Sequence, residues 1–142
     1  MRFVLDCSLV ADWFSPNLLL SSAVDRALAS LKSGQIEAHA PELLLIEFGH
    51  FLTKHVRRRE MRREEAIETW GDFGELHIEF HPVGLLTQAA FSFAIEHHAT
   101  VYDSCYVALA EKIDASVLTS DAGMSQAFRE LTRVQLVGDL YK

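Results

Sequence analysis

The stretch TVYDSCYVALAEKIDASVLTSD, residues 100–121, contains a helical pattern, a turn and a short apolar run that ends at an aspartate. Its first part, YDSCYVALAEKI, is typical of a helix, and SVLTS is typical of a strand. The same alternation continues on both sides. We expect strands at residues 2–6, 36–40, 78–83, 116–120 and 134–138. We expect helices at residues 9–13, 21–32, 41–56, 63–76, 85–98, 102–113 and 123–131. Strands separated by helices predict an α/β fold, in which helices cover both faces of a central parallel sheet of about five strands.

Length and composition limit the classes of protein that need to be considered. The 142 residues are 49% hydrophobic, which is enough for a single domain, residues 1–142, with a sizeable core. No window approaches the roughly 18 uncharged apolar residues of a membrane helix, and the opening MRFVLDCS is not typical of a targeting segment. We therefore expect a soluble, cytoplasmic protein. Cys7 and Cys105 lack the spacing of zinc ligands and are expected to be small buried hydrophobic residues.

Four acidic residues interrupt or end apolar stretches: Asp6 in FVLD, Glu47 in LLLIEF, Asp103 in TVYDSCYVAL and Asp121 in VLTSD. We call these residues the four acids. A carboxylate in apolar surroundings carries a desolvation cost unless a positive group joins it. Asp6 and Asp121 follow strands, Asp103 opens a helix, and Glu47 lies about two turns into another. Because ligands gather at the carboxyl ends of parallel strands, this placement predicts a shared divalent-metal site.

The chemistry of the four acids favours particular ions. Carboxylate oxygens are hard ligands and favour Mg²⁺ or Mn²⁺ over zinc. Without metal, the four acids would repel one another by about 1 to 4 kcal/mol per close pair. With metal, a bound water becomes a nucleophile and the ion stabilises charge on a phosphate. The pattern therefore favours hydrolysis at phosphate.

Each of the four acids also has a simple structural explanation. Asp103 can form a capping box with Thr100, and Asp121 can cap the helix that follows it. Asp6 can be an ordinary turn residue at a strand end, and Glu47 can face solvent. None of these explanations accounts for the shared placement of the four.

The net charge of −7 hides a basic segment, Lys54–Arg63, KHVRRREMRR, which holds six of the 13 Lys and Arg residues. One interpretation is a phosphate-binding surface, in which Arg58, Arg59, Arg62 and Arg63 make the contacts. The other is a solvated helix end whose arginines pair with nearby glutamates. The sequence leaves both open.

Together these motifs resemble the PIN-domain family of metal-dependent ribonucleases, and specifically the VapC-type toxins. The resemblance covers nearly the whole chain. It rests on Asp6-Cys7-Ser8 after the first strand, on Pro41-Glu42-Leu43 leading to Glu47, on YDSCYVALA at residues 102–110 and on LTSD at residues 118–121. The last two blocks, with starts about 16 residues apart, are the most specific.

The resemblance implies a PIN-like three-layer fold in which the four acids bind Mg²⁺ or Mn²⁺, with Ser8 and Thr119 as supporting hydroxyls. The implied activity is RNA cleavage by the toxin of a toxin-antitoxin pair. An RNA substrate, a cognate antitoxin and a homodimer are therefore expected, and the basic segment would contact the RNA. Phe48, Phe51 and Leu52 would offer the antitoxin an apolar surface, although a buried core explains these residues equally well.

Two positions depart from the family pattern. His50 stands where an amide is common, three residues after Glu47, and Asp12 stands where a basic residue is common. The alternative from another class is a noncatalytic PIN-like module that binds protein or RNA, and metal-dependent RNA cleavage discriminates between the two. His77 and His81 lie four residues apart, but a strand there would separate them too widely for an easy shared ion.

Overall fold

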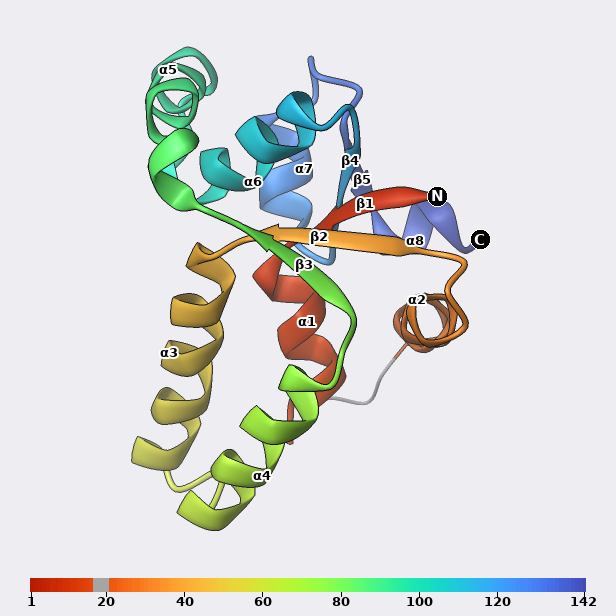
Figure 1. Ribbon diagram of the computed structural model, residues 1–142, viewed down its shortest axis with the longest axis vertical. Coiled ribbons are helices and arrows are strands. Elements are labelled where there is room, and N and C mark those ends of the chain that lie inside the picture. The colour runs from red at the N-terminus through yellow and green to blue at the C-terminus, as the bar shows by residue number, and fades with distance from the viewer. Residues whose placement is uncertain (17–20) are drawn as a thin grey trace.

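A five-stranded sheet forms the middle layer of the computed structural model, which describes residues 1–16 and 21–142 (Figure 1). The strands are β1 (Arg2–Leu5), β2 (Glu37–Pro41), β3 (Ile78–His81), β4 (Ser116–Thr119) and β5 (Val134–Leu136). They lie in the order β3-β2-β1-β4-β5, and every neighbouring pair is parallel. The predicted parallel sheet is therefore confirmed.

Helices cover both faces of this sheet, as the alternation of patterns predicted. The helices are α1 (Cys7–Phe14), α2 (Ser22–Lys32), α3 (Leu43–Arg57), α4 (Arg63–Gly74), the 3-10 turn η1 (Val83–Leu85), α5 (Thr87–His97), α6 (Val101–Lys112), α7 (Ala122–Ala127) and α8 (Val137–Leu140). Figure 1 shows α5, α6 and α7 above the sheet and α1, α2, α3 and α4 below it. The result is the three-layer PIN-like α/β arrangement, in which helix starts meet the carboxyl ends of the strands.

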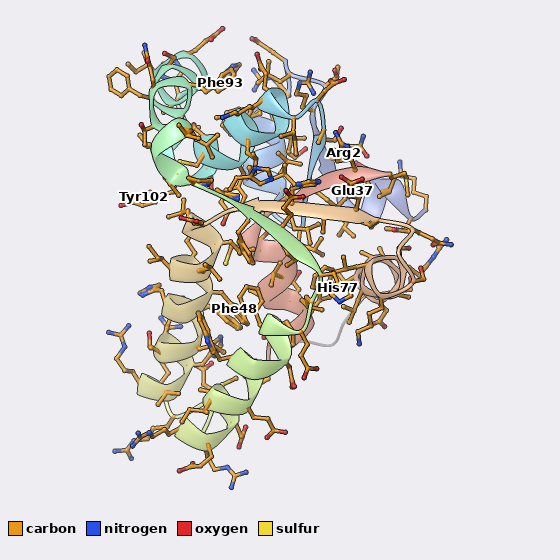
Figure 2. The ribbon with its side chains drawn as sticks, in the orientation of Figure 1. Arg2, Glu37, Phe48, His77, Phe93 and Tyr102 are labelled. Carbon is orange, nitrogen blue, oxygen red and sulfur yellow. The ribbon has the colours of Figure 1, made fainter. Side chains whose placement is uncertain are left out.

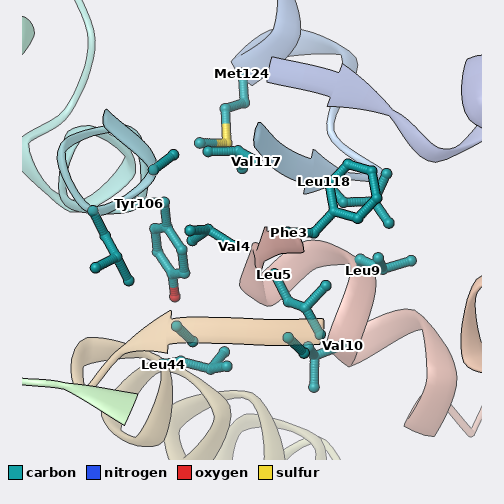
Figure 3. Packing of buried hydrophobic residues seen from close by; sticks show 14 of the residues in the cluster. Phe3, Val4, Leu5, Leu9, Val10, Leu44, Tyr106, Val117, Leu118 and Met124 are labelled. Atoms are coloured by element: carbon teal, nitrogen blue, oxygen red, sulfur yellow. The ribbon is translucent and has the colours of Figure 1, made fainter. Parts of the chain in front are cut away.

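The middle strand β1 and its neighbour β4 form the centre of the core. Val4, Leu5, Val117 and Leu118 are fully buried. Figure 3 shows Tyr106 of α6 beside Val4, with its hydroxyl pointing toward α3. These strands are continuous apolar runs without polar alternation, because helices cover both of their faces.

The chain passes from β2 into α3 later than predicted. The sequence predicts Pro41 at the start of a helix, but Pro41 ends β2 and pairs in register with His81. The N–H of Glu42 then donates to the carbonyl oxygen of His81 at 2.9 Å. Proline, which lacks an N–H, fits a strand end as well as a helix start. Helix α3 begins at Leu43, so Glu47 lies about one turn into it and not two.

The last two predicted elements are shorter than expected. Helix α7 ends at Ala127 and strand β5 ends at Leu136. Val137–Leu140 forms a short helix, where the apolar run VQLVG predicts the end of a strand. A run of this length does not distinguish a strand from a helical turn by periodicity.

Cys105 is buried and Cys7 half-buried, and both are free thiols, which agrees with a role as small hydrophobic residues. In residues 1–16 and 21–142, no helix is both long enough and apolar enough to cross a membrane. The apolar residues instead form one cluster around the sheet.

Candidate active site

Asp6 lies between β1 and α1, at the carboxyl end of the middle strand, and its side chain is almost fully buried. Its extended backbone, with φ −77° and ψ 149°, makes it the N-cap of α1. The hydroxyl of Ser8 donates to Oδ2 of Asp6 at 2.5 Å, and the hydroxyl of Thr119 donates to the same oxygen at 2.8 Å. Burial raises the pKa of Asp6 above its ordinary value, although these hydrogen bonds act in the opposite direction.

Ser8 and Thr119 also tie Asp6 to the loop that follows β4. The N–H of Ser120 donates to Oγ of Ser8 at 3.1 Å, and the N–H of Asp121 donates to Oγ1 of Thr119 at 2.9 Å. Both hydroxyls reach one carboxylate because β1 and β4 are parallel neighbours. The two hydroxyls predicted to support the site therefore contact one of the four acids and position the loop that carries another.

Two more of the four acids begin helices. Asp121 is the N-cap of α7, and its Oδ1 accepts from the N–H of Gly123 at 2.8 Å. Asp103 lies in the first turn of α6, where its N–H donates to the hydroxyl oxygen of the N-cap Thr100 at 3.0 Å. The capping explanation of Asp121 agrees with its geometry, whereas Asp103 shows one of the two hydrogen bonds of a capping box, the one that its own N–H donates. Both arrangements are also compatible with a shared site, because the helix starts meet at one edge of the sheet.

Glu47, on α3, contacts a residue for which the sequence predicted no role. The hydroxyl of Tyr106, on α6, donates to Oε1 of Glu47 at 2.6 Å. Burial raises the pKa of Glu47, the hydrogen bond from Tyr106 lowers it, and the charge of Asp6 raises it again. Tyr106 is fully buried, and a buried hydroxyl requires a partner. Its place three residues after Asp103, on the same helix face, is a sequence signal that points to the site.

The charge of Asp103 interacts with those of all three other acids. Its pKa is raised to about 6, first by burial and then by repulsion from Asp6, Asp121 and Glu47. The fold thus brings the four acids, which are far apart in sequence, within electrostatic range of one another. However, the ligand atoms of the four acids do not converge on one point. Among the described residues, three ligand atoms that all lie within 4.8 Å of one another occur in a different group of side chains, on β2 and β3.

The raised pKa of Asp103 predicts how stability changes with pH in the metal-free protein. The folded state holds the proton of Asp103 more tightly than the unfolded chain does, so ionisation between about pH 4 and pH 6 lowers the free energy of unfolding. Asp103→Asn lacks this ionisation. At pH 7 the metal-free variant should be at least as stable as the wild type, and its advantage should disappear toward pH 4. Urea unfolding at both pH values measures this. A clear loss of stability at pH 7 would instead support the capping interpretation.

The basic segment lies at the turn between α3 and α4, at the end of α3 remote from Glu47 (Figure 1). The four arginines that were predicted to contact phosphate are all exposed: Arg58, Arg59, Arg62 and Arg63. A helical rise of 1.5 Å per residue puts Arg58 about 16 Å from Glu47 along the axis. Nε of Arg62 donates to Oε1 of Glu65 at 2.5 Å, so this arginine also fits a solvated helix end.

The apolar surface predicted for a partner is largely core. On α3, the side chains of Phe48 and Leu52 are buried in the core, and that of Phe51 is half-buried. Ile46 and Tyr102, in contrast, are 72% and 63% exposed. Helix α3 therefore turns the predicted phenylalanine and leucine inward and presents an isoleucine on its outer side.

Two relatives match the chain over almost their whole lengths, although no family model matches it. The chain is 35% identical over 135 residues to Ribonuclease VapC3 of Pyrobaculum aerophilum, a match that covers 92% of this chain and 98% of that protein. It is 28% identical over 134 residues to Ribonuclease VapC12 of Mycobacterium tuberculosis, with 94% and 98% covered.

A solved structure, a toxin-antitoxin complex from Klebsiella pneumoniae, contains a chain of similar fold. The TM-score is 0.69 at 12% sequence identity, and the alignment covers 95% of this chain and 97% of that one. This likeness supports the assignment of the fold alone. The 35% identity to the Pyrobaculum protein shows the family. The chain belongs to the VapC ribonuclease family, the PIN-domain toxins that its sequence motifs resemble.

Proposed function

We propose that this chain is a Mg²⁺- or Mn²⁺-dependent endoribonuclease, the toxin of a toxin-antitoxin pair, which hydrolyses RNA at the four acids. The observation that carries the proposal is the setting of Asp103, whose pKa is raised to about 6, first by burial and then by repulsion from the three other acids. Gathering four carboxylates at one edge of a sheet is unfavourable without a counter-charge. A divalent cation supplies that charge, and the ribonuclease relatives support RNA as the substrate.

The side chains fit a hard divalent cation. All four acids offer carboxylate oxygens, the ligands that Mg²⁺ and Mn²⁺ prefer. Within the described structure no three of them have ligand atoms all within 4.8 Å of one another. This spacing suits Mg²⁺, which keeps several waters and contacts some carboxylates through them. When bound, the ion supplies an activated water and stabilises charge that develops on the phosphate.

Neighbouring hydroxyls set the direction of two of the carboxylates. Ser8 and Thr119 donate to Oδ2 of Asp6, and Tyr106 donates to Oε1 of Glu47. Each carboxylate has a second oxygen and further lone pairs with which to face an ion. Outer partners of this kind orient metal ligands and strengthen metal binding. We therefore assign the three hydroxyls a positioning role.

Cleavage of labelled RNA by chelator-treated protein tests the proposal. We expect negligible cleavage in EDTA and restored cleavage after addition of Mg²⁺ or Mn²⁺. Cleavage by verified metal-free protein would contradict the proposal. RNA binding without cleavage, in the presence of either Mg²⁺ or Mn²⁺, would favour the noncatalytic PIN-like module.

Loss of the Tyr106 hydroxyl is expected to impair catalysis more than folding. Tyr106→Phe keeps the buried ring but leaves Glu47 without its donor, at a cost of about 1 to 2 kcal/mol in unfolding free energy. Because an outer partner of a proposed metal ligand is lost, the cleavage rate should fall by about 10- to 100-fold. Urea unfolding and single-turnover cleavage measure the two effects. Tyr141→Phe, on the last turn of the chain, is the control, and equal rates for the two variants would refute the positioning role.

A groove beside Glu47 offers a place for the antitoxin. It has a volume of about 570 Å³, and Ile46, Phe51 and Tyr102 line it together with Glu47. Figure 2 shows Tyr102 near the start of α3. His50 also lines the groove. Burial raises the pKa of Glu47, and the charge of His50 acts in the opposite direction. An apolar groove that leads to an acidic site fits a cationic amphipathic peptide.

We therefore also propose that this chain forms a homodimer and that a small antitoxin binds to it. The antitoxin places an Arg or Lys side chain among the four acids. Conversion of all four acids to amides should weaken antitoxin binding by at least about tenfold, because the charge-assisted hydrogen bonds are lost. Calorimetric titration with the cognate antitoxin measures this, with Asp72→Asn on α4 as the control. Unchanged affinity in the four-amide variant would refute inhibition by an antitoxin Arg or Lys placed among the four acids.

A further inference from the structure

Two histidines and a glutamate lie together on neighbouring strands, away from the four acids. His39 is on β2 and Glu79 and His81 are on β3, and His39 pairs in register with Glu79. Nδ1 of His39 is 2.9 Å from Nε2 of His81 and 3.6 Å from Oε2 of Glu79. These three ligand atoms all lie within 4.8 Å of one another. We call His39, Glu79 and His81 the histidine cluster.

A fourth residue fixes the orientation of the buried histidine. Nε2 of His39 lies 2.7 Å from Oε1 of Glu37, and Nε of Arg2 donates to the same oxygen at 3.0 Å. The carboxylate of Glu37 holds the proton of His39 on Nε2, so the lone pair of Nδ1 faces His81. Histidines that bind metal typically donate their other N–H to a carboxylate in this way. Only 5% of His39 is exposed, so its ring is held in place.

The charges around the cluster allow a cation to bind. Two charged residues act on His81: Glu79 favours a cation there, and Lys112 of α6 opposes one. The carboxylates of Glu79 and Glu37 oppose the positive charges of Lys112 and Arg2. None of the four acids is among the charges that shift the pKa of His81.

The distances are close to those of a zinc site. Two nitrogens that each lie 2.0–2.1 Å from a tetrahedral Zn²⁺ are about 3.3 Å apart. The nitrogens of His39 and His81, at 2.9 Å, need to separate by only about 0.4 Å. With its Nε2 bound to the ion, the neutral ring of His81 would carry its proton on Nδ1. Glu79, whose side chain is 69% exposed, can swing its carboxylate without disturbing the core.

We propose that His39, His81 and Glu79 form a second divalent-metal site, specific for a borderline ion such as Zn²⁺. Two imidazoles and one carboxylate suit Zn²⁺ and leave its fourth position to water, whereas Mg²⁺ prefers oxygen ligands. The bound ion ties the edge strand β3 to β2. This site does not rest on the proposed nuclease function, since it shares no residue with the four acids.

Titration with Zn²⁺ in excess Mg²⁺ tests the site. We expect one Zn²⁺ per chain, a higher melting temperature with Zn²⁺, and X-ray absorption showing two imidazole nitrogens at 2.0–2.1 Å. His81→Gln and Glu79→Gln should each weaken Zn²⁺ binding by about 100-fold or more, because each variant removes a ligand. Both residues are on the edge strand and are not fully buried, so the variants should fold.

Matched controls separate this site from other histidines and from the four acids. Figure 2 shows His77 near the end of α4, and His77 is exposed. His77→Gln should bind Zn²⁺ as the wild type does, and so should Asp103→Asn. Equal affinity in wild type and His81→Gln, no binding in the wild type, or loss of Zn²⁺ binding in Asp103→Asn would each overturn the proposal.

Discussion

Removing one charge from the four acids is expected to lower the rate of RNA cleavage by about 100-fold or more. Asp6→Asn, Asp103→Asn and Glu47→Gln keep the size of each side chain and remove the ligand charge. Loss of a residue that only orients a metal ligand costs about 10- to 100-fold, so loss of the ligand should cost at least the upper end of that range. Single-turnover cleavage at saturating Mg²⁺ gives the rate of the chemical step.

Exposed acids elsewhere provide controls for this first result. Asp25→Asn on α2 and Glu68→Gln on α4 make the same chemical changes at exposed positions. Both should cleave RNA as fast as the wild type. Higher Mg²⁺ should partly rescue the variants of the four acids, because they lose metal affinity. A wild-type rate in Asp103→Asn would remove this residue from the metal site.

Neutralising the basic segment is expected to weaken RNA binding and flatten its dependence on salt. Each lost phosphate contact changes the slope of log K against log salt by about 0.7 to 0.9, so four lost contacts change it by about three units. The variant replaces Arg58, Arg59, Arg62 and Arg63 by glutamine. Fluorescence anisotropy over a series of salt concentrations measures the slope. Mg²⁺ affinity should stay unchanged, because Arg58 lies about 16 Å from Glu47 along α3.

A charge-matched control distinguishes a local surface from a change in net charge. Neutralisation of four other exposed cations, Arg26, Lys32, Arg129 and Lys142, removes the same charge elsewhere. This control should keep the slope of the wild type. If the variant of the basic segment also keeps that slope, the segment is a solvated helix end, as the pairing of Arg62 with Glu65 allows.

The sheet was predictable because its strands are buried on both faces. Val4, Leu5, Val117 and Leu118 are fully buried and lie in short apolar runs between helical patterns. Strand and helix ends were less predictable. Pro41 is an example, since a residue without an N–H fits two kinds of boundary and only the pairing with β3 decides between them.

The acids of the candidate site and the hydroxyls of Ser8 and Thr119 could be predicted from the sequence motifs, but the role of Tyr106 could not. Tyr106 lies three residues after Asp103 in an apolar helix, and only the structure shows that its hydroxyl reaches Glu47. The histidine cluster is a second case. His39 and His81 belong to different strands, and only the pairing of β2 with β3 brings their rings together. Such contacts depend on tertiary structure, which sequence periodicity does not report.

A crystal structure of the protein soaked in Mn²⁺ tests the central claim most directly. Anomalous scattering locates Mn²⁺ independently of any activity. Our account predicts a Mn²⁺ peak among Asp6, Glu47, Asp103 and Asp121, with at least one of these carboxylates at about 2.0 to 2.3 Å and others joined through water. A Mn²⁺ peak elsewhere, with none among these four residues, would contradict it.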